Sequence, residues 1–133
     1  MPMLPITSFY SAILALLILK LAFDVIKLRL AKKQGLGYDN MNLLLAGRIH
    51  GNAIEYIPIS LIMLALAEGN GVPSMLLHII AATLVFARII HAVGFKLGQG
   101  DTHPGRFWGV ILTVLVIVAL AICNILYSWR YLI

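Results

Sequence analysis

The hydrophobic positions of the chain fall into four long runs that are separated by short polar stretches. The runs cover approximately residues 6–29, 41–67, 73–96 and 105–131. Within the last run, residues 107–127 carry no charge, and a stretch of this length can cross the hydrocarbon core of a bilayer. Backbone groups in lipid must be hydrogen-bonded internally, so each run predicts a membrane-spanning helix. The sequence therefore predicts an all-α integral-membrane fold: one domain, residues 1–133, built as an antiparallel four-helix bundle.

The polar stretches between the runs are typical of tight connections. Residues 31–42 contain two glycines and two lysines, and Asn40 is placed to cap the second helix. Residues 68–73 and 97–104 are glycine-containing turns, and each ends in a proline. Pro58 lies inside the second run, where it removes a backbone hydrogen bond and is expected to kink the helix.

Composition supports the membrane assignment. Hydrophobic residues make up 62% of the 133 residues and charged residues 11%, more apolar surface than a soluble domain of this size can bury. The net charge of +5 is not interpreted as nucleic-acid binding, because the basic residues flank the hydrophobic runs, where they set topology and contact anionic lipids. The single cysteine, Cys123, excludes an intramolecular disulfide and is expected to be a packing residue. The first charged residue is Lys20, so the N-terminus lacks the basic region of a cleavable signal peptide. The first run is therefore expected to stay as a membrane anchor.

The distribution of lysine and arginine predicts the orientation. The first connection and its flanks carry four basic residues, and the third connection has Lys96 and Arg106 at its edges. The opposite side has Arg130 in the C-terminal tail and Glu68 in its turn. Cytoplasmic loops are enriched in lysine and arginine, so both termini are predicted to lie outside the cytoplasm. The basic residues of the first connection and its flanks are Lys27, Arg29, Lys32 and Lys33.

A polar stripe interrupts the second hydrophobic run. At 100° per residue, Arg48, Asn52, Glu55 and Tyr56 fall within one arc of roughly 100°. An arginine or acidic residue at mid-membrane costs about 2.5–3.5 kcal/mol on insertion scales. These side chains are therefore expected to face protein, water or a ligand, and the stripe is the predicted site.

Further polar residues are expected at the same depth. In the predicted topology Arg48, Glu55, Arg88 and Arg106 lie toward the cytoplasmic side, and Asn52, Tyr56 and His91 complete a basic, hydrogen-bonding patch. Arginines bind carboxylates and a carboxylate binds an ammonium group, so a zwitterion with several carboxylates and one amine fits this patch. The alternative is a buried Arg48–Glu55 pair that fixes the register of the bundle.

The first run and the histidines offer further candidates. Lys20, Asp24 and Lys27 share one helix face, so Asp24 can pair with either lysine in a snorkelling helix end. Alternatively, Lys27 or Arg29 supplies positive charge to an anionic ligand. The four histidines show no recognised ligand spacing, and only His50 and His91 could share a depth suited to haem, so no metal site is predicted. The histidines are His50, His78, His91 and His103.

The pattern Arg48-x3-Asn52-x2-Glu55-Tyr56-x-Pro58 on a second membrane helix resembles the motif of the MAPEG family, the membrane-associated proteins of eicosanoid and glutathione metabolism. Phe86-Ala87-Arg88, the length and the four segments are also similar, most of all to short bacterial members. The resemblance implies a homotrimer that binds glutathione between subunits near the cytoplasmic face. His91 and Phe95 stand where eicosanoid-processing members have tyrosines, so the resemblance does not extend to eicosanoid specificity.

The resemblance also implies roles for individual residues. The residues that match the motif contact glutathione, and Arg106, at the start of the fourth segment, assists its thiolate. The full set expected to bind glutathione is Arg48, Asn52, Glu55, Tyr56, His50, Arg88, His91, Lys27 and Arg29. The leading hypothesis is a bacterial inner-membrane glutathione transferase that conjugates glutathione, its co-substrate, to hydrophobic electrophiles and also reduces lipid hydroperoxides. The alternatives are a non-catalytic protein of the same fold that binds or presents lipid and, more distantly, a small transporter.

Overall fold

The computed structural model describes residues 3–129 and 131–133, and this part of the chain is all-helical, with no strand. Arg130, which entered the charge count, lies outside the described residues. The helices have 24 to 29 residues, so at 1.5 Å per residue they are about 36–44 Å long. All four are long and apolar enough to cross a bilayer, which confirms the predicted four-helix membrane fold. They are α1 Pro5–Lys32, α2 Met41–Gly69, α3 Ser74–Leu97 and α4 Pro104–Trp129.

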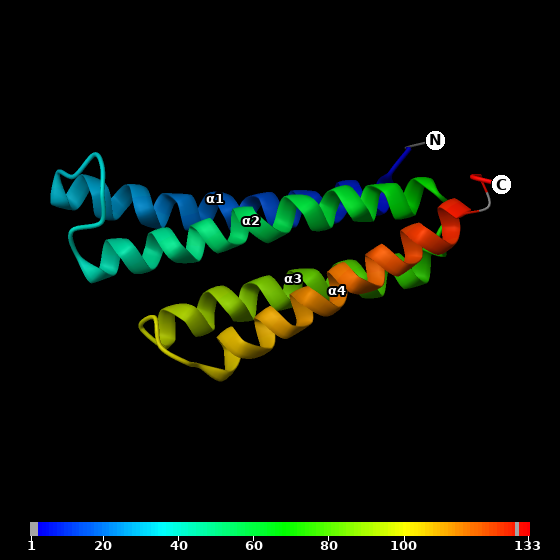
Figure 1. Cartoon of the computed structure of the whole chain (residues 1–133). Helices are drawn as coiled ribbons and strands as arrows, with labels where there is room; N and C mark the ends of the chain where they lie inside the picture. Colours follow the sequence, from blue (N-terminus) through cyan, green and yellow to red (C-terminus); the bar gives the residue numbers. More distant parts are fainter. Residues whose placement is uncertain (1–2, 130) are drawn as a thin grey trace.

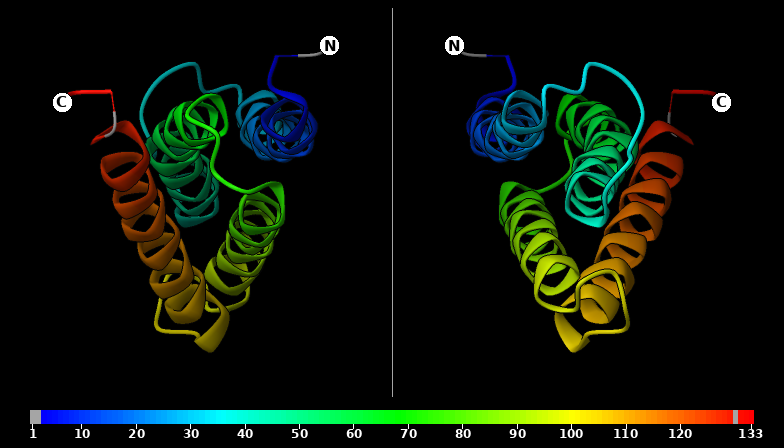
Figure 2. Two further views of the ribbon diagram at one scale, coloured as in Figure 1. Left: turned by 90° about the vertical axis from the view of Figure 1, so that its right-hand side faces the viewer. Right: turned by 90° about the vertical axis from the view of Figure 1, so that its left-hand side faces the viewer.

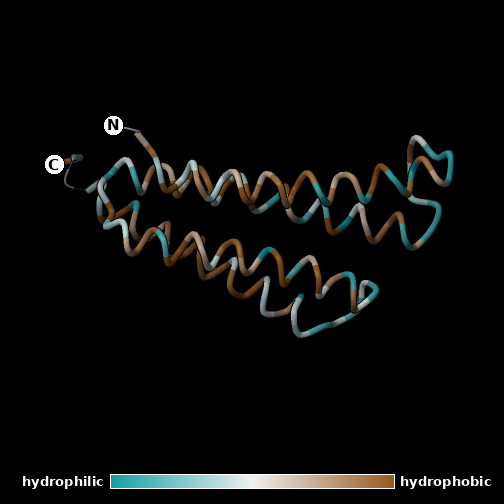
Figure 3. The backbone as a smooth tube through the Cα atoms, turned by 180° about the vertical axis from the view of Figure 1, so that it is seen from behind, coloured by the Kyte–Doolittle hydropathy of each residue, from teal (hydrophilic) through white to brown (hydrophobic). Residues whose placement is uncertain are grey.

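The helices form two antiparallel hairpins, α1–α2 and α3–α4 (Figure 1). The hairpins converge at the end that holds both termini and diverge toward the two basic loops (Figures 1 and 2). The α1–α2 hairpin also projects further at the diverging end, where hydrophilic residues gather (Figure 3). Within the described residues α1 packs against α2 and α3 but not against α4. The bundle is therefore open between its hairpins near the basic loops.

The core is a narrow apolar seam, and the outer surface is apolar as well. Aliphatic side chains from all four helices fill the seam and are almost inaccessible, whereas many large hydrophobic side chains are exposed. Such a surface is unfavourable in water and suited to lipid. Seam residues include Leu14, Leu64, Leu77, Leu84 and Leu120, and exposed residues include Phe9, Leu16, Phe86, Trp108 and Leu115.

Two side-chain caps fix the starts of the first two helices. The Asn40 Oδ1 atom accepts a hydrogen bond from the Leu43 amide at 2.9 Å, which confirms the predicted cap of α2. Helix α1 has no such cap of its own. Instead the Glu68 carboxylate, from the last turn of α2, accepts hydrogen bonds from the amides of Ile6 at 2.9 Å and Thr7 at 2.8 Å. The sequence had suggested only a loop charge for Glu68.

Asp24, Pro58 and Cys123, which the sequence analysis singled out, lie in α1, α2 and α4, respectively. Asp24 forms its ion pair with Lys20, one of the two lysines expected to compete for it. Pro58 lies inside α2, which continues to Gly69. Cys123 is buried in the apolar seam, as expected for a packing residue.

Glycines allow α3 and α4 to approach closely. A Cβ atom at Gly109 would lie 2.7 Å from the His91 Cα atom and 2.8 Å from the Ala87 carbonyl oxygen. A Cβ atom at Gly94 would overlap the backbone of Gly105 and its neighbour. Small residues are common where membrane helices pack tightly, because association in lipid depends on van der Waals contact. This packing places α3 and α4 for the polar contacts described below.

We expect Gly109→Ala to destabilise the protein, because backbone atoms of α3 would have to move away from α4. The expected loss is about 1–3 kcal/mol, the usual range for overpacking, measured as a lower midpoint of thermal unfolding in detergent. Gly69→Ala is the matched control, since a Cβ atom there meets no heavy atom within 4 Å. Equal midpoints for the two variants would show that α3 and α4 do not need this close approach.

Candidate functional site

The centre of the polar site is Arg88, whose side chain is buried inside the bundle with 2% exposed. Its Nη2 atom donates a hydrogen bond to Asn52 Oδ1 at 2.6 Å, and its Nη1 atom donates to Thr113 Oγ1 at 3.4 Å. The acceptors lie on α2 and α4, and Arg88 itself is on α3. One guanidinium group therefore joins three of the four helices.

His91 and Tyr56 complete what we call the Arg88 network: Arg88, Asn52, Thr113, His91 and Tyr56. The Nη2 atom of Arg88 lies 3.2 Å from His91 Nδ1, and the Tyr56 ring centroid is 5.8 Å from the guanidinium carbon. Thr113 in turn donates a hydrogen bond to the Gly109 carbonyl oxygen at 2.7 Å. The network thus brings together four predicted site residues, two from α2 and two from α3.

The Arg88 network contains no carboxylate. No ion pair involves Arg88 within the described residues, and its buried Nε atom has no hydrogen-bond partner there. Removing a charge from water is costly unless an opposite charge or several hydrogen bonds compensate it. The site can therefore stabilise an anionic group brought close to Arg88.

The polar stripe of α2 divides into two edges. Asn52 and Tyr56 are half-buried and reach Arg88, whereas Arg48 and Glu55 are exposed. At 100° per residue, Asn52 and Tyr56 lie about 40° and 80° from Arg48 on one side of the helix, and Glu55 lies about 20° from Arg48 on the other side. In the part of the chain that the structure covers, Arg48 and Glu55 form neither an ion pair nor a hydrogen bond. The alternative of a buried Arg48–Glu55 pair is therefore wrong.

The exposed edge of the stripe lies within a membrane-spanning helix. Glu55 is at the middle of α2, fourteen residues from each end of Met41–Gly69. A charged side chain at this depth is expensive to leave in contact with lipid. A second protein surface or a polar ligand is therefore needed to cover Arg48 and Glu55.

Two predicted arginines hold the basic loops. The Nη1 atom of Arg106 donates hydrogen bonds to the carbonyl oxygens of Gly100 and Asp101, and its guanidinium carbon lies 3.9 Å from the Phe95 ring centroid. The Nη1 atom of Arg29 donates to Gly35 O at 3.1 Å, and its guanidinium carbon lies 5.3 Å from the ring centroid of Tyr38. Both guanidinium groups are thereby fixed near the diverging ends of the hairpins.

The remaining predicted residues do not join the Arg88 network. His50 is half-buried and Lys27 is exposed, and neither makes a hydrogen bond or ion pair with another described residue. Among residues 3–129 and 131–133, no group of three or more His, Cys, Asp or Glu side chains could hold a metal ion.

Sequence reasoning missed two polar residues of α4. Thr113 receives a hydrogen bond from Arg88, and Asn124 Nδ2 donates to the carbonyl oxygens of Met63 and Leu120, both at 2.9 Å. Both residues lie in the charge-free stretch that was treated as uniformly apolar. A hydroxyl or amide inside such a span is itself a signal, because it needs a partner within the protein.

Comparisons with known proteins agree with this architecture. Residues 7–126 match the MAPEG family. The chain is 36% identical over 91 residues to "Inner membrane protein YecN" of Escherichia coli strain K12, an alignment that covers 68% of this chain and 70% of that protein. The protein of the same name from Escherichia coli O6:H1 gives the same identity and coverage.

We expect Arg88 and Asn52 to be energetically coupled. In a double-mutant cycle with Arg88→Lys and Asn52→Ala, the interaction free energy should be about 0.5–3 kcal/mol, the range for residues in one hydrogen-bond network. The measurement is the free energy of unfolding in detergent. Asn124→Ala is the matched control, because Asn124 is an amide on α4 that bonds to other partners, and its cycle with Arg88→Lys should be additive. Additivity in the Asn52 cycle would contradict the hydrogen bond.

Proposed function

Because the chain belongs to the MAPEG family, we propose that it is a membrane-bound glutathione transferase that conjugates glutathione to hydrophobic electrophiles. The reduction of lipid hydroperoxides by glutathione is proposed as a second activity of the same site. Apolar electrophiles concentrate in the bilayer, whereas glutathione is a water-soluble peptide. An enzyme embedded in the membrane boundary can bind both, and the four spanning helices provide that location.

The observation that carries the proposal is a set of charges without ion-pair partners among the described residues: the buried Arg88, and Arg48 and Glu55 on the exposed edge of the polar stripe. Glutathione has two carboxylates, one ammonium group and a thiol. Guanidinium groups bind carboxylates through paired hydrogen bonds, and a carboxylate such as that of Glu55 binds an ammonium group. The ligand therefore supplies the opposite charges that the described chain itself does not provide here.

The exposed edge of the stripe also supports a homotrimer as part of the proposal. Arg48 and Glu55 project from the surface of a single subunit within the membrane, where lipid cannot solvate them. A neighbouring subunit packed on this edge would enclose the ligand and keep both charges from lipid. We place the site at the subunit interface, between the middle of α2, where Glu55 lies, and its cytoplasmic end, with both termini outside the cytoplasm.

In the proposed mechanism, Arg106 stabilises the glutathione thiolate. A free thiol titrates near pH 8.5, so only a few per cent is nucleophilic at neutral pH. Lowering the pKa of the bound thiol by two units requires about 2.7 kcal/mol. A guanidinium about 4 Å away, at an effective dielectric constant near 20, supplies roughly 4 kcal/mol before desolvation. Arg106 donates its hydrogen bonds to the loop from Nη1, so other N–H groups of its guanidinium remain for a ligand.

We expect Glu55→Gln to weaken glutathione binding by about ten-fold or more, because the ligand's ammonium group loses its carboxylate partner. Isothermal titration calorimetry on the purified, assembled protein measures this directly. Asp39→Asn is the matched control, since it removes an exposed carboxylate from the α1–α2 connection. If Glu55→Gln binds glutathione with wild-type affinity, Glu55 does not contact the ligand's ammonium group.

Arg106 separates catalysis from binding. Arg106→Ala should change glutathione affinity only a few-fold but raise the pKa of the bound thiol by roughly one to two units. Turnover of a chlorinated aromatic at neutral pH should then fall about ten- to a hundred-fold and partly recover at higher pH, while Arg106→Lys should keep part of the effect. Thiolate absorbance against pH is the direct measurement. A thiol pKa unchanged by Arg106→Ala would leave Arg106 as a loop anchor, and absence of turnover in the wild type would favour the non-catalytic lipid-binding alternative.

A further inference from the structure

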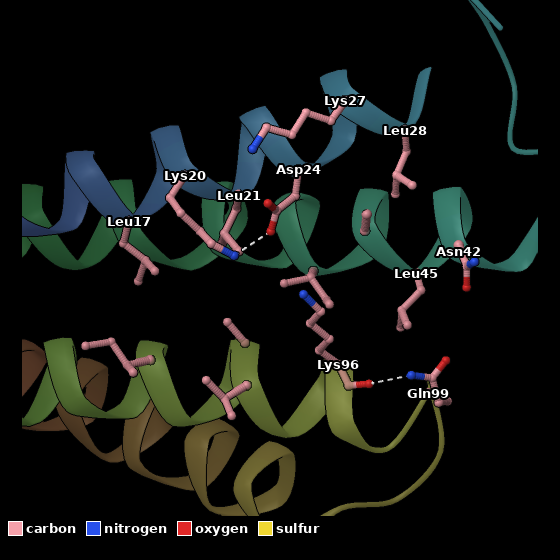
Figure 4. Close-up of a pocket in the computed structure, with 15 residues that line it drawn as sticks. Leu17, Lys20, Leu21, Asp24, Lys27, Leu28, Asn42, Leu45, Lys96 and Gln99 are labelled. Carbon is pink, nitrogen blue, oxygen red and sulfur yellow. Dashed lines mark hydrogen bonds and ion pairs between the residues drawn. The ribbon is translucent and has the colours of Figure 1, made fainter. Parts of the chain in front are cut away.

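A cavity of about 460 Å³ lies between the two hairpins, toward the end that carries the basic loops (Figure 4). Its walls come from α1, α2 and α3 of one subunit and are mainly aliphatic, with Leu21, Leu45, Ile49 and Ala92 among them. Arg48 and Glu55 do not line it. Lys27 is the residue that it shares with the set expected to bind glutathione, so the cavity is a second, separate feature.

Charged side chains surround this aliphatic space. Lys20, Lys27, Lys96 and Asp24 all line it, and Asp24 pairs with Lys20. Lys27 and Lys96 have no ion-pair partner among the described residues. Lys20 and Lys96 extend toward each other across the gap, from α1 and α3 (Figure 4). The cavity therefore combines an apolar interior with an excess of two positive charges.

The size of the cavity restricts its occupant. Sites for small organic ligands are typically about 300–1,000 Å³. A water molecule occupies about 30 Å³ of liquid and a methylene group is of similar size, so roughly fifteen carbon atoms fit. This is the volume of one alkyl chain, whereas a diacyl phospholipid carries two. Ile89 and Val93 line the cavity and are 44% and 52% exposed, which provides an entrance from the bilayer.

We propose that this cavity binds a single-chain anionic amphiphile, a fatty acid, within each subunit. The alkyl chain lies against the aliphatic walls, and the carboxylate is held by Lys96, which extends into the gap from α3 (Figure 4). Burial of the chain removes apolar surface from water at the open end of the bundle, and the unpaired lysines provide the charge complementarity. The site does not depend on glutathione, so it stands or falls separately from the proposed transferase activity.

The test uses equilibrium binding of radiolabelled palmitate and hexadecanol to the full chain in non-ionic detergent, without glutathione. The two probes have the same chain length and differ in the head group. We expect about one palmitate per chain and an affinity at least ten-fold higher than that for hexadecanol. Lys96→Gln should weaken palmitate binding about five- to ten-fold and leave hexadecanol binding unchanged, because only palmitate is charged. Lys32→Gln is the control for a general loss of positive charge, since Lys32 does not line the cavity.

A second variant tests the cavity itself. Val93→Trp should fill the space and weaken binding of both probes at least ten-fold, whereas Ile79→Trp, an exposed position on α3 outside the cavity, should not. If Val93→Trp does not assemble, Ile89→Trp tests the same wall one turn away. Equal affinity for palmitate and hexadecanol, unchanged binding in Val93→Trp or Ile89→Trp, or displacement of palmitate by equimolar phosphatidylglycerol would each overturn the proposal.

Discussion

The structure depends on one buried positive charge. Arg88 is buried between α2, α3 and α4 and has no ion-pair partner among the described residues, and its hydrogen bonds to Asn52 and Thr113 fix the relative rotation of three helices. Apolar side chains alone specify this rotation weakly in a membrane, because lipid and leucine are equally apolar. The close approach of α3 and α4 at Gly109 lets Thr113 of α4 reach the guanidinium of Arg88, which also contacts His91 one turn along α3. Polar contacts therefore set the register, and apolar packing fills the remainder.

The helices could be predicted from the sequence because each apolar run has the length of a bilayer crossing, and Asn40 marked the start of α2. The division of the polar stripe could not. Periodicity gives the angles between Arg48, Asn52 and Glu55 but not the absolute rotation of α2, which depends on its neighbours. Thr113 escaped notice because a hydroxyl is a weak signal beside charged residues. We predict that a ligand and a neighbouring subunit cover Arg48 and Glu55, and neither can be inferred from the fold of a single chain.

The two hairpins differ in how they are held. Glycine contacts bring α3 and α4 together beside their connecting loop, whereas α1 meets α2 and α3 and leaves the cavity near the basic loops. Arg106 and Arg29 stiffen the loops at the same end through backbone carbonyl groups. The open end thus has ordered loops around a space that side chains do not fill. This combination suits a region that admits ligands, while the converging end supplies rigidity.

The contact between Glu68 and the start of α1 has a consequence for biogenesis. The amides of Ile6 and Thr7 are completed by a carboxylate that is synthesised more than sixty residues later. While α1 emerges alone, these donors must be solvated at the membrane surface, and they gain their partner once α2 has crossed the bilayer. The start of α1 is therefore completed only after the whole of α2 has been synthesised, and the contact ties the first helix to the end of the second.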